Sequence, residues 1–288
     1  MSKYEIILDV CKTNSISKTA AKLNYTQSAV SQLIKGFEKE LGLPLFKRTK
    51  HGVQLLPNTE EIVLSLEIIC REEKRIQQTA ANLNSLDSGY IRIGSIQSIS
   101  YHWLPDILRK FSECYPKITF ELYVEGFRPL INSLKNNKLD CIFVSRYSVP
   151  DYPFLPLGKD ELMLVTPKGH PLSEQVAVSL SDVNKQDFIL TCDRLDYETG
   201  KIFEMNGIRP KIRYQVNEDF AALKMVEKGF GITILPKLLL HNAPFDICVR
   251  SFTEHYSRVL GAAYLPDTQP SPATLKFLSF AKEWGKNI

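Results

Sequence analysis

The feature that most restricts the fold of this chain is a run of 29 residues, 59–87, that contains neither glycine nor proline. Its apolar residues recur at steps of three, four and seven, which predicts one continuous helix about 40 Å long. A helix of that length is longer than a small domain needs for its own packing. It therefore divides the chain into a short N-terminal module, residues 1–58, and a larger body, residues 88–288.

The apolar positions of this linker segment form a heptad seam in which one slot, Glu73, is charged. The seam favours pairing with a second copy of the chain, so that the segment acts as a dimerisation helix. The alternative is a long helix that packs only on its own body. The seam comprises Ile62, Leu66, Ile69, Ile76, Ala80 and Leu83.

Charge separates the two ends of the chain more clearly than composition does. The net charge of the whole chain is +4, but residues 1–58 hold nine Lys/Arg against four Asp/Glu, whereas the remainder holds 27 against 28. A basic end on a nearly neutral body favours nucleic-acid binding by the N-terminal module.

Two short helices are predicted within that module. Ser17 is a suitable N-cap for the first, Asn24-Tyr25-Thr26 interrupts the pattern, and the second begins near Gln27. The small pair Ala20-Ala21 would allow the two helices to cross closely, as in a helix-turn-helix. The second helix is expected to bury Val30, Ile34, Phe37 and Leu41 on one face.

Polar side chains that suit DNA recognition occupy the opposite face of the second helix. Glutamine can pair with adenine, serine reaches bases or phosphates, and lysine neutralises phosphate. A hairpin predicted over 46–55 carries three cations near its tip, as a DNA-contacting wing would. The alternative is a helical hairpin with solvated polar faces. The helix residues are Ser28, Ser31, Gln32 and Lys35, and the hairpin cations are Lys47, Arg48 and Lys50.

Residues 15–59 closely resemble the DNA-binding module of the LysR-type transcriptional regulators. The resemblance implies a winged helix-turn-helix that binds double-stranded promoter DNA in a homodimer or homotetramer. It is carried by Ala20-Ala21, Leu23, Gln27, Ala29-Val30-Ser31, Glu38, Leu41-Gly42, Pro44-Leu45-Phe46 and Arg48-Thr49. The base or phosphate contacts that it implies come from Gln27, Ser28, Ser31, Gln32 and Lys35, with Arg48 and Lys50 on the wing.

The body alternates short apolar strands with helical segments, which predicts an α/β architecture. Strands near 90–94, 119–124 and 141–145 with helices over 101–115 and 129–136 indicate a parallel β-α-β-α-β unit. A second set follows, with strands near 161–166, 188–191 and 211–216 and a helix over 218–228. A last helix near 273–284 is expected to pack back on the first lobe.

This body resembles the effector domain of the same regulators, which is similar to type 2 periplasmic solute-binding proteins. Lobe I would comprise about 88–161 and 266–288, and lobe II about 162–265. A cleft between two such lobes predicts a small-molecule site at the ends of the strands.

The cleft is expected to bind a small, anionic effector. Ser98 and Ser100 match the effector-contacting turn of the family, and Arg146 could pair with a carboxylate. The alternative is that Ser98 is only an N-cap and Arg146 a surface or inter-lobe ion pair. The residues proposed for the effector site are Ser98, Ser100, Gly126, Phe127, Arg146, Thr191 and Asp193.

No catalytic or metal-binding motif is evident, so neither a cofactor nor an enzymatic reaction is expected. The six cysteines lie at wide spacings without C-x-x-C, and no signal peptide or membrane span is apparent, which predicts a cytoplasmic protein. Two other interpretations stay open. One is a redox-sensing regulator that uses Cys192; the other is a solute-binding or enzymatic α/β protein with an accessory helix-turn-helix.

Overall fold

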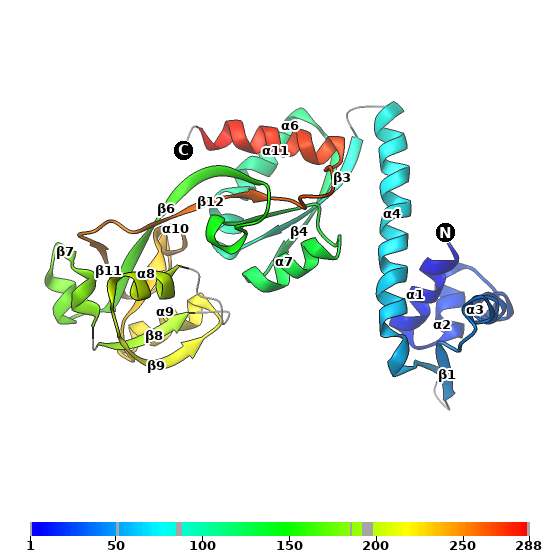
Figure 1. Cartoon of the computed structure of the whole chain (residues 1–288), viewed down its shortest axis with the longest axis horizontal. Helices are drawn as coiled ribbons and strands as arrows, with labels where there is room; N and C mark the ends of the chain where they lie inside the picture. The colour runs from blue at the N-terminus through cyan, green and yellow to red at the C-terminus, as the bar shows by residue number, and fades with distance from the viewer. Residues whose placement is uncertain (1, 50–51, 85–87, 185, 192–197, 287–288) are drawn as a thin grey trace. The chain divides into compact units, whose positions relative to one another are not determined.

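The computed structural model describes residues 2–49, 52–84, 88–184, 186–191 and 198–286. The chain divides into two compact units, Met1–Ala81 and Asn82–Ile288 (Figure 1). Each unit has its own hydrophobic core, so each is described separately.

Three helices build the N-terminal unit, and a side chain caps each of them at its first turn. They are α1 (Lys3–Thr13), α2 (Ile16–Leu23) and α3 (Gln27–Leu41). Ser2 forms a capping box with Glu5, and Thr26 accepts a hydrogen bond from the Ala29 amide. The helix-turn-helix and the start of α3 at Gln27 are confirmed. The predicted cap of α2 at Ser17 is wrong, because Ser15 accepts the capping hydrogen bond from the Lys18 amide at 3.2 Å.

The core of this unit lies between α1, α2 and the inner face of α3. Val30, Ile34 and Phe37 are buried there as predicted. Leu41 is 38% exposed, because α3 ends at this residue and the chain turns away at Gly42. Of the two predicted small residues, only Ala20 is buried at the helix crossing.

The predicted wing is a two-stranded antiparallel hairpin of β1 (Phe46–Thr49) and β2 (Gly52–Leu55). Glu38 of α3 holds the start of the hairpin in place, because one oxygen of its carboxylate accepts hydrogen bonds from the Leu45 and Phe46 amides at 2.8 and 3.1 Å. Gly52 lies against the end of α1, where a side-chain Cβ would come within 2.3 Å of the Asn14 carbonyl oxygen. The wing strands are therefore attached to both α1 and α3.

The linker helix α4 (Glu60–Asn84) follows a short 3-10 turn, Pro57–Thr59. Leu66 is buried in the core of the N-terminal unit and Ile62 packs against that core. Further along the predicted seam, Ile69 and Ile76 are 39% and 68% exposed within this single chain. The first part of the seam therefore packs on the N-terminal unit, whereas Ile69 and Ile76 form an exposed apolar row further along the helix.

The C-terminal unit is built on an eight-stranded sheet that runs through two lobes. The strand order is β4-β3-β5-β12-β6-β11-β7, and β10 pairs with β6. In lobe I, β3 (Ser88–Ser95) pairs in parallel with β4 (Lys117–Val124) and β5 (Cys141–Ser145), which confirms the predicted parallel unit. The helices are α5 (Gln97–His102), α6 (Leu104–Cys114), α7 (Phe127–Lys135) and α11 (Pro272–Gly285).

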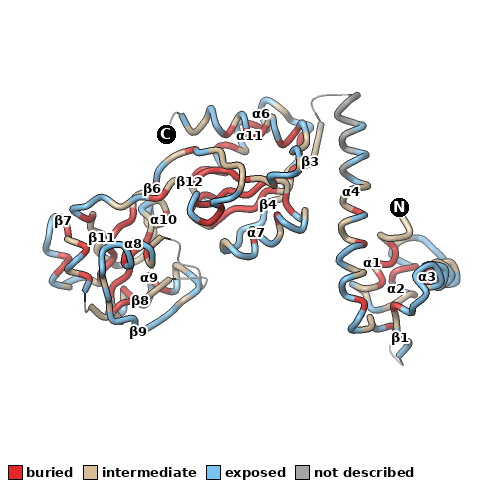
Figure 2. The backbone as a smooth tube through the Cα atoms, viewed as in Figure 1, coloured by how far each residue is buried: buried red, intermediate tan, exposed pale blue. Residues whose placement is uncertain are grey.

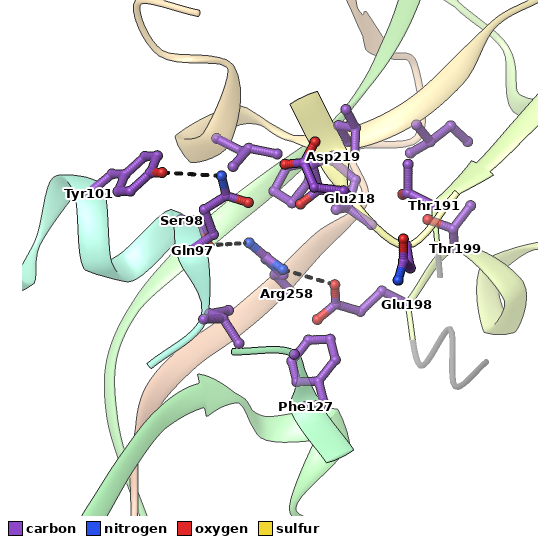
Figure 3. Close-up of a pocket in the computed structure, with 18 of the residues that line it drawn as sticks. Gln97, Ser98, Tyr101, Phe127, Thr191, Glu198, Thr199, Glu218, Asp219 and Arg258 are labelled. Atoms are coloured by element: carbon purple, nitrogen blue, oxygen red, sulfur yellow. Dashed lines mark hydrogen bonds and ion pairs between the residues drawn. The ribbon is translucent and has the colours of Figure 1, made fainter. Parts of the chain in front are cut away.

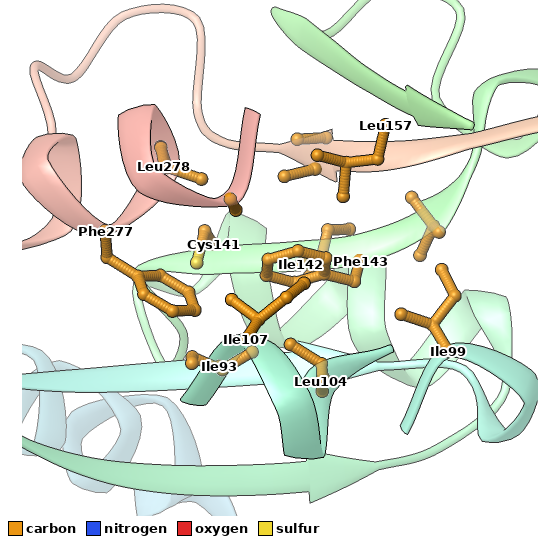
Figure 4. Packing of buried hydrophobic residues seen from close by; sticks show 14 of the residues in the cluster. Ile93, Ile99, Leu104, Ile107, Cys141, Ile142, Phe143, Leu157, Phe277 and Leu278 are labelled. Carbon is orange, nitrogen blue, oxygen red and sulfur yellow. The ribbon is translucent and has the colours of Figure 1, made fainter. Parts of the chain in front are cut away.

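One helix of lobe I differs from the prediction for a local reason, and another is as predicted. The single helix expected over 101–115 is two helices that meet at Trp103, because Pro105 cannot donate the amide hydrogen bond that would continue α5 into α6. The last helix does pack back on lobe I as predicted, and its Phe277 contacts Phe111 in the core. Figure 4 shows Phe277 near Phe143, which it also contacts.

Lobe II holds a second, smaller parallel pair, β8 (Asp187–Thr191) and β9 (Lys211–Val216). In lobe I, β5 is buried at every position, whereas β4 is buried only at Ile118. In lobe II, β9 is exposed along most of its length (Figure 2). The other elements are α8 (Thr199–Asn206), α9 (Asp219–Glu227), α10 (Lys237–Leu240), β7 (Ala177–Val178), β10 (Thr233–Pro236) and β11 (Ile247–Phe252).

Two long antiparallel strands, β6 (Phe154–Pro167) and β12 (Ser257–Ala263), connect the lobes. The boundary that the sequence predicted between lobe I and lobe II, at residues 161/162, falls inside β6. Leu260–Ala263 of β12 pair with β5, so this half of β12 lies in the lobe I sheet. The connecting strands face each other in register, with Arg258 opposite Asp160.

Candidate functional site

The predicted DNA-contacting residues of the recognition helix lie together on the solvent side of α3. Gln27, Ser28, Gln32 and Lys35 are exposed, and Ser31 is half-buried. Their placement follows from the burial of Val30, Ile34 and Phe37 on the opposite side of the helix. The result is an exposed polar row on an α-helix, an element that the major groove of B-DNA admits.

The wing residue Arg48 lies beside this row. Its Nη2 is 3.5 Å from Ser31 Oγ and can donate a hydrogen bond to it, although the two residues are 17 positions apart in the chain. Ser28 is tied to the start of the helix, where its hydroxyl is 3.1 Å from the hydroxyl of Thr26. Lys50 lies outside the described residues. The structure thus brings together all of the predicted DNA-contacting residues that it describes.

A cavity of about 450 Å³ lies between the lobes of the C-terminal unit (Figure 3). Lobe I contributes α5 and the β4–α7 junction, lobe II contributes α8, α9 and β10, and the connecting strands contribute Leu162 and Arg258. Its volume lies in the range of small-molecule sites. The apolar part of the lining comprises Ile96, Val124, Phe127, Leu162, Ile234, Leu235, Pro236 and Leu239.

Four of the predicted effector-site residues line this cavity, namely Ser98, Gly126, Phe127 and Thr191. Ser100 is buried behind it instead, because its hydroxyl donates to the Ile96 carbonyl at 3.0 Å within the turn of α5. Asp193 lies outside the described residues, as does Cys192.

Arg146, the predicted receiver of an anion, does not line the cavity. Its guanidinium donates at 3.1–3.2 Å to the carbonyl oxygens of Val149, Pro150 and Tyr152. It also lies over the ring of Phe154, 5.3 Å from the ring centroid. Arg146 therefore stabilises the loop that follows β5, a role that neither reading of the sequence predicted.

The cation that does reach the cavity is Arg258, which the sequence analysis did not identify. It is only 4% exposed. Its Nε and Nη2 donate to Asp160 Oδ2 at 3.1 and 2.9 Å, and Nη2 also donates to Ser98 Oγ at 2.9 Å. Its Nη1 donates to Glu198 Oε2 at 3.1 Å. Arg258 thus links α5 of lobe I, the connecting strand β6 and the start of α8 in lobe II.

The register of the connecting strands explains this arrangement, because it places Arg258 directly opposite Asp160. Both charges stand directly before an apolar run of the sequence, Asp160 before 161–166 and Arg258 before 259–264. A search for opposite charges beside those two runs would have found the pair.

Acidic side chains occupy the lobe II side of the cavity. Glu218 caps α9, since its carboxylate accepts the Phe220 and Ala221 amides at 3.1 and 2.6 Å. Asp219, the next residue, also faces the cavity. Burial raises the pKa of Asp219 to about 6, while Arg258 and a hydrogen bond from Thr191 act in the opposite direction.

The described cysteines do not form a redox pair. Cys11, Cys70, Cys114, Cys141 and Cys248 are all free thiols. Burial raises the pKa of the Cys11 thiol to about 11 and raises the pKa of Cys141 above its usual range. Within the described residues there is no group of His, Cys, Asp or Glu side chains that could hold a metal ion. Over the same residues, no helix has both the length and the apolar character needed to cross a bilayer.

An exposed helix-turn-helix face in one unit and an inter-lobe cavity in the other define a class of protein, the transcription regulators with a small-molecule-binding domain. Two family models match the chain. "Bacterial regulatory helix-turn-helix protein, lysR family" matches residues 1–60, and "LysR substrate binding domain" matches residues 84–286. The chain therefore belongs to the LysR family of DNA-binding transcriptional regulators.

Individual relatives agree with this assignment. YybE of Bacillus subtilis (strain 168), described as an uncharacterized HTH-type transcriptional regulator, is 26% identical over 281 residues that cover 96% of each chain. The effector-binding domain of QuiR, solved with shikimate, is 31% identical and has a TM-score of 0.64, covering 69% of this chain and 98% of that one. Full-length CbnR, solved with its target DNA, has a TM-score of 0.77 at 18% identity and covers 99% of this chain and 100% of that one, which supports the fold.

Proposed function

We propose that the solvent face of α3 enters the major groove of promoter DNA and reads base edges. The observation that carries the proposal is the exposed polar row of α3 with Arg48 of the wing beside it. Gln27, Ser31 and Gln32 are the proposed base readers, while Ser28, Lys35 and Arg48 contact phosphates. Lys50 is a further phosphate contact expected from the sequence alone.

The proposed effector site is the cavity between the lobes. Ser98, Gly126, Phe127 and Thr191 line it from both sides, so a bound molecule touches both lobes at once. Binding would favour one relative arrangement of the lobes, and that change would alter DNA binding without any reaction of the ligand. Support comes from QuiR, whose corresponding domain was solved with shikimate.

We further propose that two chains pair through the exposed part of α4. Ile69 and Ile76 continue the apolar row of this helix beyond the core of the N-terminal unit. A second copy would cover that row and hold two DNA-binding modules for a palindromic site, in a dimer or a tetramer. Because the partner is chromosomal DNA, the proposed place of action is the cytoplasm.

Two measurements on the full-length chain test these proposals. Selection from a random DNA pool is expected to enrich a palindromic sequence whose affinity falls steeply as salt rises. A thermal-shift screen of small metabolites is expected to find compounds that raise the melting temperature and change affinity for the selected DNA. If the selection enriched no particular DNA sequence, the proposal that α3 reads base edges would be wrong. A ligand whose binding is insensitive to Thr199→Trp, which narrows the cavity, would remove the proposed site.

A further inference from the structure

The charges that line the inter-lobe cavity are mostly negative. Among the described lining residues, Arg258 is the only cation. Four carboxylates line the same cavity, those of Glu125, Glu198, Glu218 and Asp219. An anionic ligand would therefore enter a field of its own sign unless Arg258 were available to receive it.

Arg258 is already engaged by protein carboxylates. Asp160 accepts two of its hydrogen bonds and Glu198 accepts a third, and the side chains of these two acids are only 2% and 10% exposed. Two buried carboxylates more than neutralise one guanidinium. An anion could reach Arg258 only by displacing one of them, at the cost of leaving that carboxylate without its partner.

Asp219 lies differently from the other acids. It occupies the first position of α9, but Glu218 accepts the amides at that helix end, so capping does not require the Asp219 carboxylate. Figure 3 shows Asp219 and Glu218 side by side at the cavity. Burial raises the pKa of Asp219 to about 6, so holding it ionised in the ligand-free cavity costs free energy that a bound cation would recover.

We infer that the effector carries a protonated amine, which pairs with Asp219 while Glu218 and Glu125 add negative charge around it. The inference rests on the proposed function, because it takes the cavity to be the effector site. The rest of the molecule would pack on the apolar wall of Leu162, Ile234 and Leu235 and hydrogen-bond to hydroxyls such as that of Tyr101.

The test compares three probes of equal length and different charge on the full-length protein. They are putrescine, 4-aminobutanoate and succinate, with shikimate as a second anion. Binding is measured by calorimetry and by the melting temperature at pH 7.5. Putrescine or 4-aminobutanoate is expected to bind, and Asp219→Asn is expected to weaken that binding by about tenfold or more. Glu125→Gln, from lobe I, is expected to weaken it by a smaller factor.

Glu113→Gln is the matched control, because Glu113 is an exposed acid on α6 whose carboxylate pairs with Arg109 and does not line the cavity. It is expected to leave every affinity unchanged. Binding of succinate or shikimate without binding of either amine would overturn the inference and leave the effector site in place. If a wider set of amines and anions gave no binding at all, the proposed effector site would itself be overturned.

Discussion

The recognition face of α3 and the inter-lobe cavity both depend on polar side chains, but they hold those side chains in opposite ways. On α3, the side chains of Gln27, Gln32 and Lys35 are exposed to solvent. In the cavity, Arg258 holds Ser98, Asp160 and Glu198 in one buried network. Substitutions on α3 should therefore change binding alone, whereas substitutions in the cavity should also change stability.

The largest expected effect is that of Arg258→Ala. Removing the guanidinium leaves Asp160 and Glu198 buried without a counter-charge, so the free energy of unfolding should fall by about 3–5 kcal/mol. Urea unfolding followed by tryptophan fluorescence measures this, since both tryptophans, Trp103 and Trp284, lie in the C-terminal unit. Arg109→Ala, at an exposed ion pair, should cost less than about 1 kcal/mol. Equal losses of unfolding free energy in the two variants would contradict the idea that the buried network contributes more to stability than an exposed ion pair.

On the DNA side, Gln32→Ala should weaken binding to the selected operator by about 1–3 kcal/mol if Gln32 makes a bidentate base contact. The melting temperature should not change, because the side chain is exposed. A gel-shift titration against the operator and against a variant base pair measures affinity and discrimination. Gln175→Ala, at an exposed position of lobe II, is the matched control. Unchanged affinity and unchanged discrimination would exclude Gln32 from the base readers.

Asp219→Asn should stabilise the ligand-free protein by about 1–2 kcal/mol at pH 7. Because the pKa of Asp219 is raised to about 6 in the folded protein, the native state binds more protons than the unfolded chain between about pH 4 and pH 6. The wild-type protein should therefore lose stability as pH rises through this window, and the variant should not. Urea unfolding from pH 3.5 to 7.5 measures the difference, which should vanish at the acid end. A constant difference at every pH would mean that ionisation of Asp219 is not its cause.

The smallest expected effect belongs to Arg48→Gln. Loss of one phosphate contact should reduce the slope of log affinity against log salt by about 0.9 and leave base discrimination unchanged. Fluorescence anisotropy with operator DNA at several salt concentrations measures the slope. Lys110→Gln, an exposed lysine of α6, should leave the slope as it is. A change in base discrimination on Arg48→Gln would instead place this residue among the base readers.

The sequence predicted the exposed face of α3 better than the lining of the cavity, because the face of a helix is local in sequence. The spacing of Val30, Ile34 and Phe37 fixes which side of α3 is buried, and the exposure of the proposed base readers follows from that spacing. The error at Ser17 is of the same local kind, since two serines lie near the helix start and only Ser15 has the extended backbone of a cap.

The cavity depends on contacts between distant parts of the chain. Arg258 contacts Ser98, 160 positions away in the sequence, and Asp160, 98 positions away. The spacing of apolar residues does not predict which distant residues pair in this way. Arg146 stands at the end of a strand, where a ligand-binding cation is plausible, but the path of the next six residues brings three of their carbonyl oxygens to it. The sequence predicted that a cleft exists and which turns border it, while the choice of cation needed the folded chain.

The attachment of the wing bears on how fast this regulator can find its site. Glu38 holds the entrance of the hairpin to α3, and Val53 donates its amide to the Asn14 carbonyl at 3.0 Å beside the tight approach of Gly52. The strands of the wing and α3 consequently form one preformed body, which under the proposed function would meet DNA as a unit. Little conformational entropy is left to lose at the encounter, so association should proceed close to the rate that diffusion and charge allow, and discrimination between sites should reside in the rate of dissociation.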